Sequence, residues 1–292
     1  MIAKTDTLSI GTLFRTFWGK VLITWGLTLM ETAFFALMPL MIGHSIDGLL
    51  SGDLQPFQFL IAMFVLVLIV ATGRRIYDTR AYGTMRVELG KAQAARSAQD
   101  PVSIANARVL MGRELVDFLE DTAPKTMTAL VQVVASVVIL LSFHGTLALS
   151  SGGSAIAILV IYALFSRSFF RANAALNEQS ENQVSVLESK SPKQIAAYFP
   201  GLRRQEVRLS DTESLVYGLI FAVLMTMVAF NLWFAATQSG ASAGDIFAIV
   251  TYSTQFLEAA VTLPFALQNL KRLREITHRI NRSGRALVGE GK

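Results

Sequence analysis

Two glutamates interrupt long apolar stretches of this sequence. Glu31 lies within residues 21–43, and Glu258 lies within residues 246–272. An ionisable side chain inside a bilayer costs about 3 kcal/mol on insertion scales, so such residues are candidates for function. A buried carboxylate holds a proton more tightly than an exposed one. Each glutamate can therefore carry a proton between the two membrane faces or bind a cationic group of a solute.

The two glutamates are predicted to lie at one level of the membrane. Glu31 is ten residues from the start of its stretch, and Glu258 is twelve residues from the start of its own. At 1.5 Å per residue, both lie roughly 15 to 18 Å deep in a core about 30 Å thick. A purely structural role stays open, in which a protonated glutamate bonds to a neighbouring side chain such as Thr28, Thr32, Thr254 or Gln255.

Aromatic and polar side chains within the apolar stretches are candidates for a cavity wall around these glutamates. They are Trp25, Phe35, Asn231, Tyr252 and Gln255. Ordinary packing and interhelical hydrogen bonding are the alternatives for each of them. The three scattered histidines and the absence of cysteine predict no metal site and no cofactor. No catalytic residue is predicted, because the interiors of the stretches offer neither Asp nor His for an intramembrane enzyme.

The composition indicates what must position these residues. The chain has 292 residues, of which 52% are hydrophobic and 16% are charged, too apolar for an ordinary soluble domain. An all-α membrane protein with six transmembrane helices is predicted, followed by a short basic cytoplasmic tail at residues 281–292. The six-helix domain is expected over residues 1–280, with spans at about 21–43, 57–80, 124–143, 153–172, 212–236 and 246–272.

The basic residues predict one orientation of these spans. The three short loops assigned to the outside contain no Lys or Arg, whereas the N-terminal segment, the two long loops and the C-terminal segment are rich in both. By the positive-inside rule, both termini are cytoplasmic, in the inner membrane. The net charge of +5 is then a consequence of topology, and no nucleic-acid partner is expected.

The two long inner loops share one pattern, which predicts two long cytoplasmic helical hairpins. Each begins with Pro-free helix formers that continue the preceding span, and each then reaches a capping residue followed by proline, Asp100-Pro101 and Ser191-Pro192. A short helix is expected to begin at each of these sites. The first is expected to end at Gly112 and the second at Pro200-Gly201.

Six spans with two such hairpins resemble the transmembrane domain of ABC exporters of the six-helix, type IV class, over about residues 12–280. The resemblance implies a domain-swapped homodimer that encloses a central cavity. It also implies that Pro101, Ile104, Pro192 and Ile195 belong to coupling helices that contact an ATPase.

The sequence departs from such exporters because it contains no GxxxxGK[ST] phosphate loop, so it is not expected to be an enzyme that hydrolyses ATP. In this respect it is similar in mechanism to the SbmA/BacA-type peptide uptake proteins, which use the proton gradient. The expected function is alternating-access transport of a small or peptide-like solute by a proton-coupled homodimer. A membrane subunit served by a separate ATPase is the alternative, and a non-transporting scaffold is a third possibility.

Overall fold

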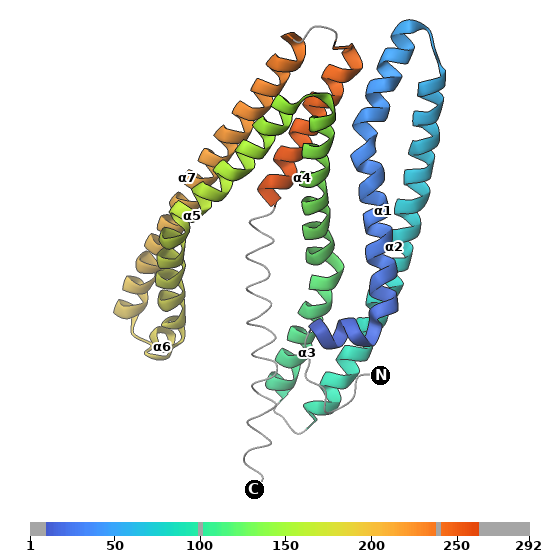
Figure 1. The fold of residues 1–292 in the computed structure, drawn as a ribbon. Helices are drawn as coiled ribbons and strands as arrows, with labels where there is room; N and C mark the ends of the chain where they lie inside the picture. Colours follow the sequence, from blue (N-terminus) through green and yellow to red (C-terminus); the bar gives the residue numbers. More distant parts are fainter. Residues whose placement is uncertain (1–9, 99–101, 238–240, 263–292) are drawn as a thin grey trace. The chain divides into compact units, whose positions relative to one another are not determined.

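In a computed structural model of the chain, the described residues are 10–98, 102–237 and 241–262, and nearly all of them are helical (Figure 1). The elements in chain order are α1 (Ile10–Ser51), α2 (Gln55–Arg96), α3 (Val102–Asp117), the π-helix η1 (Phe118–Thr122), α4 (Ala123–Phe143), α5 (Gly145–Glu181), α6 (Gln183–Glu188) and α7 (Pro192–Thr237). Residues 243–262 form a further helix. The predicted all-helical fold is confirmed.

Five segments are long and apolar enough to cross a membrane, namely Gly11–Ser51, Gln55–Arg96, Gly112–Phe143, Gly145–Ser180 and Pro192–Thr237. Their outward surface is apolar as well, since Leu68 and Ile69 on α2 are 66% and 63% exposed. Such a surface is suited to lipid. The chain is therefore an integral membrane protein. The sixth span stays a prediction, because residues 263–272 lie outside the described part of the chain.

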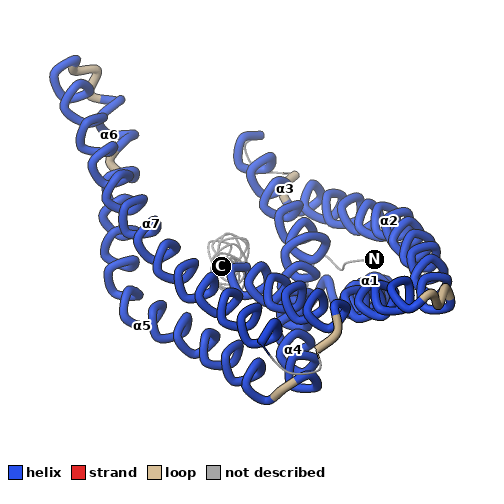
Figure 2. The backbone as a smooth tube through the Cα atoms, turned by 90° about the horizontal axis from the view of Figure 1, so that it is seen from above, coloured by secondary structure: helices blue, strands red, loops and turns tan. Residues whose placement is uncertain are grey.

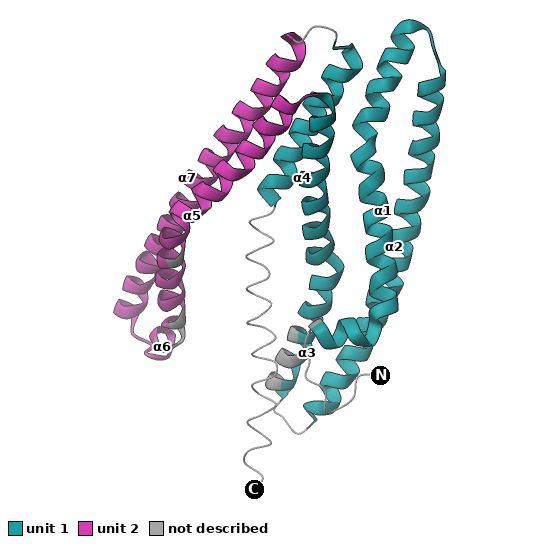
Figure 3. Ribbon diagram, in the orientation of Figure 1, with its two compact units in different colours: residues 1–143, 238–292 teal, residues 144–237 magenta. Residues whose placement is uncertain are grey.

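The chain divides into two compact units (Figure 3). Unit 1 consists of residues 1–143 and 238–292, and unit 2 consists of residues 144–237. The boundary at the end of α4 follows from a local break, because His144 has extended backbone angles (φ −164°, ψ 139°). Its Nδ1 accepts a hydrogen bond from the Thr146 amide at 3.1 Å and so caps α5.

In unit 1, α2 folds back along α1 (Figure 2). The helix α1 bends at Phe17 (φ −116°, ψ 21°), so its first turns run across the direction of the rest (Figure 1). A core lies where these first turns meet α2, α3 and η1, and its fully buried members are Leu13, Val21, Tyr82, Met85, Leu89, Leu115, Val116 and Leu119. The Tyr82 hydroxyl donates to the Leu119 carbonyl at 2.9 Å, which ties α2 to η1.

The two sequence segments of unit 1 are joined at the end of α1. Ser242 and Asp245 cap the helix of residues 243–262 reciprocally, since each side chain accepts from the other residue's amide. Asp47 accepts from the Ser242 hydroxyl at 2.6 Å and from the Gly244 amide at 2.9 Å. A Cβ at Gly43 would lie 2.6 Å from the Gly244 carbonyl oxygen, so the backbones meet directly.

Unit 2 is a pair of long packed helices, α5 and α7, with the short α6 between them in sequence (Figure 2). Small side chains and hydroxyl groups lie between the two long helices. The Ser151 hydroxyl donates to Met227 Sδ at 3.4 Å, and the Tyr198 hydroxyl donates to the Gln179 carbonyl at 2.9 Å. These contacts lie at opposite ends of α7, so the two helices stay packed along their length.

The helix ends predicted at Gly112 and at Pro200-Gly201 are wrong, because α3 runs to Asp117 and α7 runs to Thr237. Both glycines permit close packing instead. A Cβ at Gly112 would lie 3.3 Å from Gln93 Cγ, and one at Gly201 would lie 3.1 Å from Gln179 Nε2. Pro200 removes one hydrogen bond from α7 without ending the helix.

Candidate functional site

Unit 1 contains an open cavity of about 610 Å³, which is in the size range of small-molecule sites. Its wall is built from α1, α2, η1, α4 and the helix of residues 243–262. The residues that line it are Thr28, Phe35, Arg74, Arg75, Asp78, Glu120, Asp121, Pro124, Lys125, Thr128, Ala129, Gln132, Gln255, Glu258, Ala259 and Thr262. A cavity lined by this many charged residues is unusual beside apolar membrane helices, and we therefore take it as the candidate site.

An ion-paired arginine forms one wall. Arg74 stands at the end of the apolar stretch of α2, and its Nε donates to the Glu31 carboxylate across on α1. Its Nη1 donates to Asp78 Oδ2 at 2.9 Å, one turn further along α2. Arg74 is 26% exposed, Glu31 15% and Asp78 10%. One guanidinium therefore binds two nearly buried carboxylates that would otherwise be unpaired charges.

The π-helix η1 supplies two more carboxylates. Its widened turn is closed by the Ala123 amide, which donates to the Phe118 carbonyl five residues earlier. Pro124 follows directly, and a proline ring in a regular α-helix clashes with the carbonyl four residues before it, here that of Glu120. The wide turn relieves this clash, and π-turns of this kind are frequent at functional sites. Glu120 and Asp121 both line the cavity as a result.

These two carboxylates already have basic partners. Asp121 pairs with Lys125 one turn further on, at 2.7 Å. Glu120 accepts from Arg86 of α2, which also donates to Asp117 at 2.6 Å. Because a guanidinium keeps its proton in proteins, Arg86 stays charged and fixes η1 against α2.

A pair of amides and a carboxylate complete the wall. Gln132 Nε2 of α4 donates to Gln255 Oε1 at 2.6 Å. Glu258 and Thr262 follow Gln255 at intervals of three and four residues, which places them on one face of the helix. Glu258 is exposed to the cavity, and its side chain has no hydrogen bond or ion pair within the described residues.

Three of the predicted site residues line this cavity, namely Phe35, Gln255 and Glu258. Glu31 is not among the lining residues, but it is bound to Arg74, which is. Its partner is therefore not one of the predicted residues Thr28, Thr32, Thr254 and Gln255. This ion pair places Glu31 beside the residue that ends the apolar stretch of α2.

The other three predicted cavity residues have different surroundings. Trp25 packs against the core of unit 1, with its ring 5.7 Å from that of Phe14. Tyr252 is fully buried, and its hydroxyl donates to the Ala36 carbonyl at 2.6 Å. Asn231 belongs to unit 2, where it is buried and its Nδ2 donates to Met227 Sδ at 3.4 Å. The first two support helix packing in unit 1 and do not line the cavity.

Three of the four residues predicted to lie in coupling helices occupy the starts of α3 and α7. Pro192 is the first residue of α7, where the Ile195 amide donates to the Ser191 carbonyl at 3.0 Å. Ile104 is in the first turn of α3, and Pro101 lies outside the described residues. Both segments lead directly into longer helices, so no separate short helix is present at either described site.

A family model described as ABC transporter transmembrane region matches residues 10–244. The chain belongs to this family. No curated protein matches it. It is therefore the transmembrane region of a membrane transporter, and the family is not in itself a class of enzymes.

Most of the charged wall in this ABC transporter region was missed at the level of sequence. The predicted site residues include none of Arg74, Arg75, Glu120, Asp121 and Lys125. One available signal was the i, i+4 spacing of Arg74 and Asp78 at the edge of an apolar stretch. A second was the acidic pair directly before Pro124. Neither signal reveals a partner on another helix.

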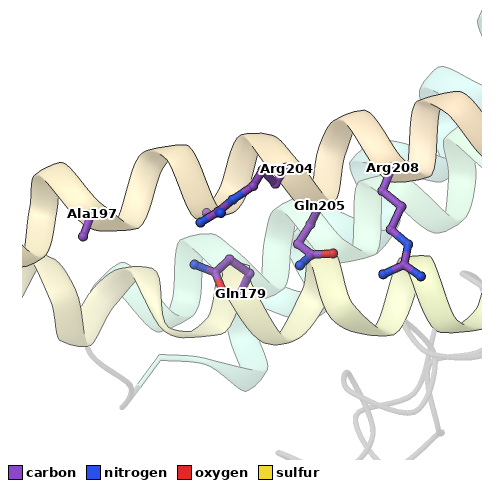
Figure 4. Close-up of a pocket in the computed structure, with 6 residues that line it drawn as sticks. Gln179, Ala197, Arg204, Gln205 and Arg208 are labelled. Carbon is purple, nitrogen blue, oxygen red and sulfur yellow. The ribbon is translucent and has the colours of Figure 1, made fainter.

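Unit 2 of the transporter region has its own hollow, of about 520 Å³, between α5 and α7 (Figure 4). Gln179 of α5 points toward α7, and Gln205 and Arg208 of α7 point toward α5, with Arg204 one turn before Arg208 (Figure 4). Gly201 is also part of its wall. The hollow lies beside the close contact of Gly201 with Gln179, and its lining residues come from both helices.

Proposed function

We propose that this ABC transporter region moves a small or peptide-like solute by alternating access, and that the cavity of unit 1 lies on the solute's path. The observation that carries the proposal is the cavity wall. Seven charged side chains from three helical elements and from the helix of residues 243–262 surround an open space of about 610 Å³. Ionisable residues at membrane depth are otherwise rare, and where present they mark solute or ion pathways.

The proposed assembly is a homodimer in the inner membrane with both termini in the cytoplasm. The orientation is supported by the basic residues, which are absent from the loop after α1 and from the start of α5. Pairing is supported by the family, since a transporter region of this kind needs a second half to enclose a path. A domain-swapped arrangement of the cytoplasmic helices is part of this proposal.

An ATPase is the proposed source of energy. It would dock at the starts of α3 and α7, where Ile104 and Ile195 lie. The family supports this choice. Glu31, one of the two predicted proton sites, is already bound to Arg74 and is therefore not a free carboxylate.

Proton coupling through Glu258 is the second candidate. It is supported by the carboxylate of Glu258, which faces the cavity without a partner among the described residues. A homodimer would present two such carboxylates. If protons drive transport, Glu258→Gln abolishes coupling, whereas Glu31→Gln alters stability alone.

Accessibility of one cysteine tests alternating access directly, because the natural chain contains none. Thr128→Cys is placed in the cavity wall, and Leu68→Cys on the lipid-facing surface is the matched control. In proteoliposomes, a membrane-impermeant maleimide should label Thr128→Cys from one side at rest. It should label the same variant from the other side when ATP and an ATPase, or a pH gradient, are supplied.

The two sources of energy give different results in this assay. A switch of side with ATP and a copurified ATPase supports the first candidate, and a switch with the pH gradient alone supports the second. Labelling from one side under every condition contradicts alternating access. Labelling of Leu68→Cys should stay low throughout, because its side chain faces lipid.

A further inference from the structure

The charged residues of the unit 1 cavity differ in whether they already have a partner. Seven charged residues line the cavity, and five of these are held in ion pairs within the protein. Arg74 is bound to Glu31 and Asp78. Lys125 is bound to Asp121, and Glu120 is bound to Arg86. These five contribute shape and rigidity, and their charges are largely neutralised before any solute arrives.

Two charged side chains of the wall have no ion pair or hydrogen bond among the described residues, namely Arg75 and Glu258. They carry opposite charges and stand on different helices, α2 and the helix of residues 243–262. Both are exposed at the cavity. A guanidinium fits a carboxylate through two parallel hydrogen bonds, and a carboxylate accepts from an ammonium group.

The amide pair in the same cavity wall adds a third recognition element. Gln132 Nε2 donates to Gln255 Oε1, which leaves one acceptor on Gln132 and donors on Gln255 available. A peptide group offers one N–H donor and one C=O acceptor and so matches this pair. Phe35, Ala129 and Ala259 give apolar wall beside it.

We infer that the cavity binds a zwitterionic solute of the short-peptide class, its ammonium group at Glu258, its carboxylate at Arg75 and a peptide group at the Gln132–Gln255 pair. This inference rests on the proposed transport function and specifies its substrate. A solute with two negative charges could pair with Arg75 but would be repelled by Glu258. A solute with two positive charges could pair with Glu258 but would be repelled by Arg75.

Trialanine and its capped forms test the assignment in the Thr128→Cys background. The readout is the concentration of peptide that halves the rate of maleimide labelling in detergent-solubilised protein. Trialanine should protect the cysteine. N-acetylation removes the ammonium group and amidation removes the carboxylate, and each change should raise the half-protecting concentration about tenfold or more, since a hydrogen bond to a charged group contributes about 1.5 to 3 kcal/mol.

Two variants make the assignment specific to each end of the peptide. In Glu258→Gln the penalty for N-acetylation should disappear while the penalty for amidation remains. In Arg75→Gln the pattern should be reversed. Glu206→Gln and Arg80→Gln are the matched controls, since both residues are exposed and lie outside the cavity wall. Loss of helix packing would weaken all peptides alike and cannot produce this crossed pattern.

The four forms to compare are free, N-acetylated, amidated and doubly capped trialanine. Equal protection by all four forms, or protection by none of them, overturns the zwitterion assignment. The four-form comparison in the Thr128→Cys protein is sufficient for this if either charge variant does not fold. The switch of labelling side described above needs no solute, so alternating access can hold while the substrate class fails. An absent switch with intact peptide protection would contradict the transport function alone.

Discussion

At the scale of single residues, the decisive contact is the ion pair of Glu31 with Arg74. It changes the interpretation of Glu31 from a free carboxylate to one that is bound by a guanidinium. Arg74 stays charged at every physiological pH, because a guanidinium does not lose its proton in proteins. Glu258 is exposed at the cavity, and nothing among the described residues binds its side chain.

A double-mutant cycle measures this ion pair. Glu31→Gln alone leaves Arg74 with Asp78, and Arg74→Gln alone leaves two unpaired carboxylates, so each should lower the free energy of unfolding by about 1 to 3 kcal/mol. The double variant should lose less than the sum, with a coupling of about 1 kcal/mol or more. Melting of the purified protein in one detergent is the measurement. Strictly additive losses would show that the pair contributes nothing.

Polar residues in an apolar stretch are conspicuous in the sequence by themselves, and two of them, Glu258 and Gln255, line the cavity. Arg74 could not be predicted as a cavity residue, because a basic residue at the end of a span has an ordinary explanation in topology. Its partner is 43 residues away on another helix, and no local pattern encodes that distance. A single sequence shows which charges exist and not which of them are already neutralised.

At the scale of helices, glycine was the main source of error. Gly112 and Gly201 were expected to end helices, and both lie inside helices at close contacts. The absence of a side chain serves either purpose equally, so the residue type cannot distinguish them. The starts of helices were more predictable. Ser191-Pro192 does begin α7, because a capping residue followed by proline fits few other conformations.

Two glycine substitutions separate these roles. Gly112→Leu should lower the free energy of unfolding by about 1 to 3 kcal/mol, because its side chain must displace Leu89 and Gln93. Gly90→Ala is the matched control on α2, where a Cβ meets nothing within 4 Å. That change should raise stability by about 0.5 to 1 kcal/mol through helix propensity. Equal effects of the two substitutions would show that Gly112 makes no close contact.

At the scale of the whole molecule, unit 1 is closed by the contact between Gly43 and Gly244 and by the hydrogen bonds of Asp47. The six-span prediction gave no reason for Asp47, which lies just after the first predicted span. Its role depends on a helix almost two hundred residues later in the chain, so pairing of this kind is visible only in three dimensions.

Asp47→Ala should therefore loosen the helix of residues 243–262 from α1. Two hydrogen bonds to a carboxylate are lost, and the expected decrease in unfolding free energy is about 2 to 4 kcal/mol. Asp53→Ala is a control from the neighbouring loop, where the carboxylate accepts from the Gln55 amide alone at 2.9 Å. Melting of both variants in detergent is the measurement, and a decrease for Asp47→Ala no larger than that for Asp53→Ala would contradict the role of Asp47.

The division of unit 1 into two separate segments has a consequence for biosynthesis. The ribosome delivers residues 1–143 first and the whole of unit 2 next, and only then residues 243–262. Domains generally fold as units as the chain emerges. Unit 2 can form as soon as it is inserted, whereas unit 1 waits for its last helix. Until Gln255 and Glu258 arrive, the charged side chains of α2 and α4 lack one wall of their cavity, and the membrane-insertion machinery must shelter them from lipid.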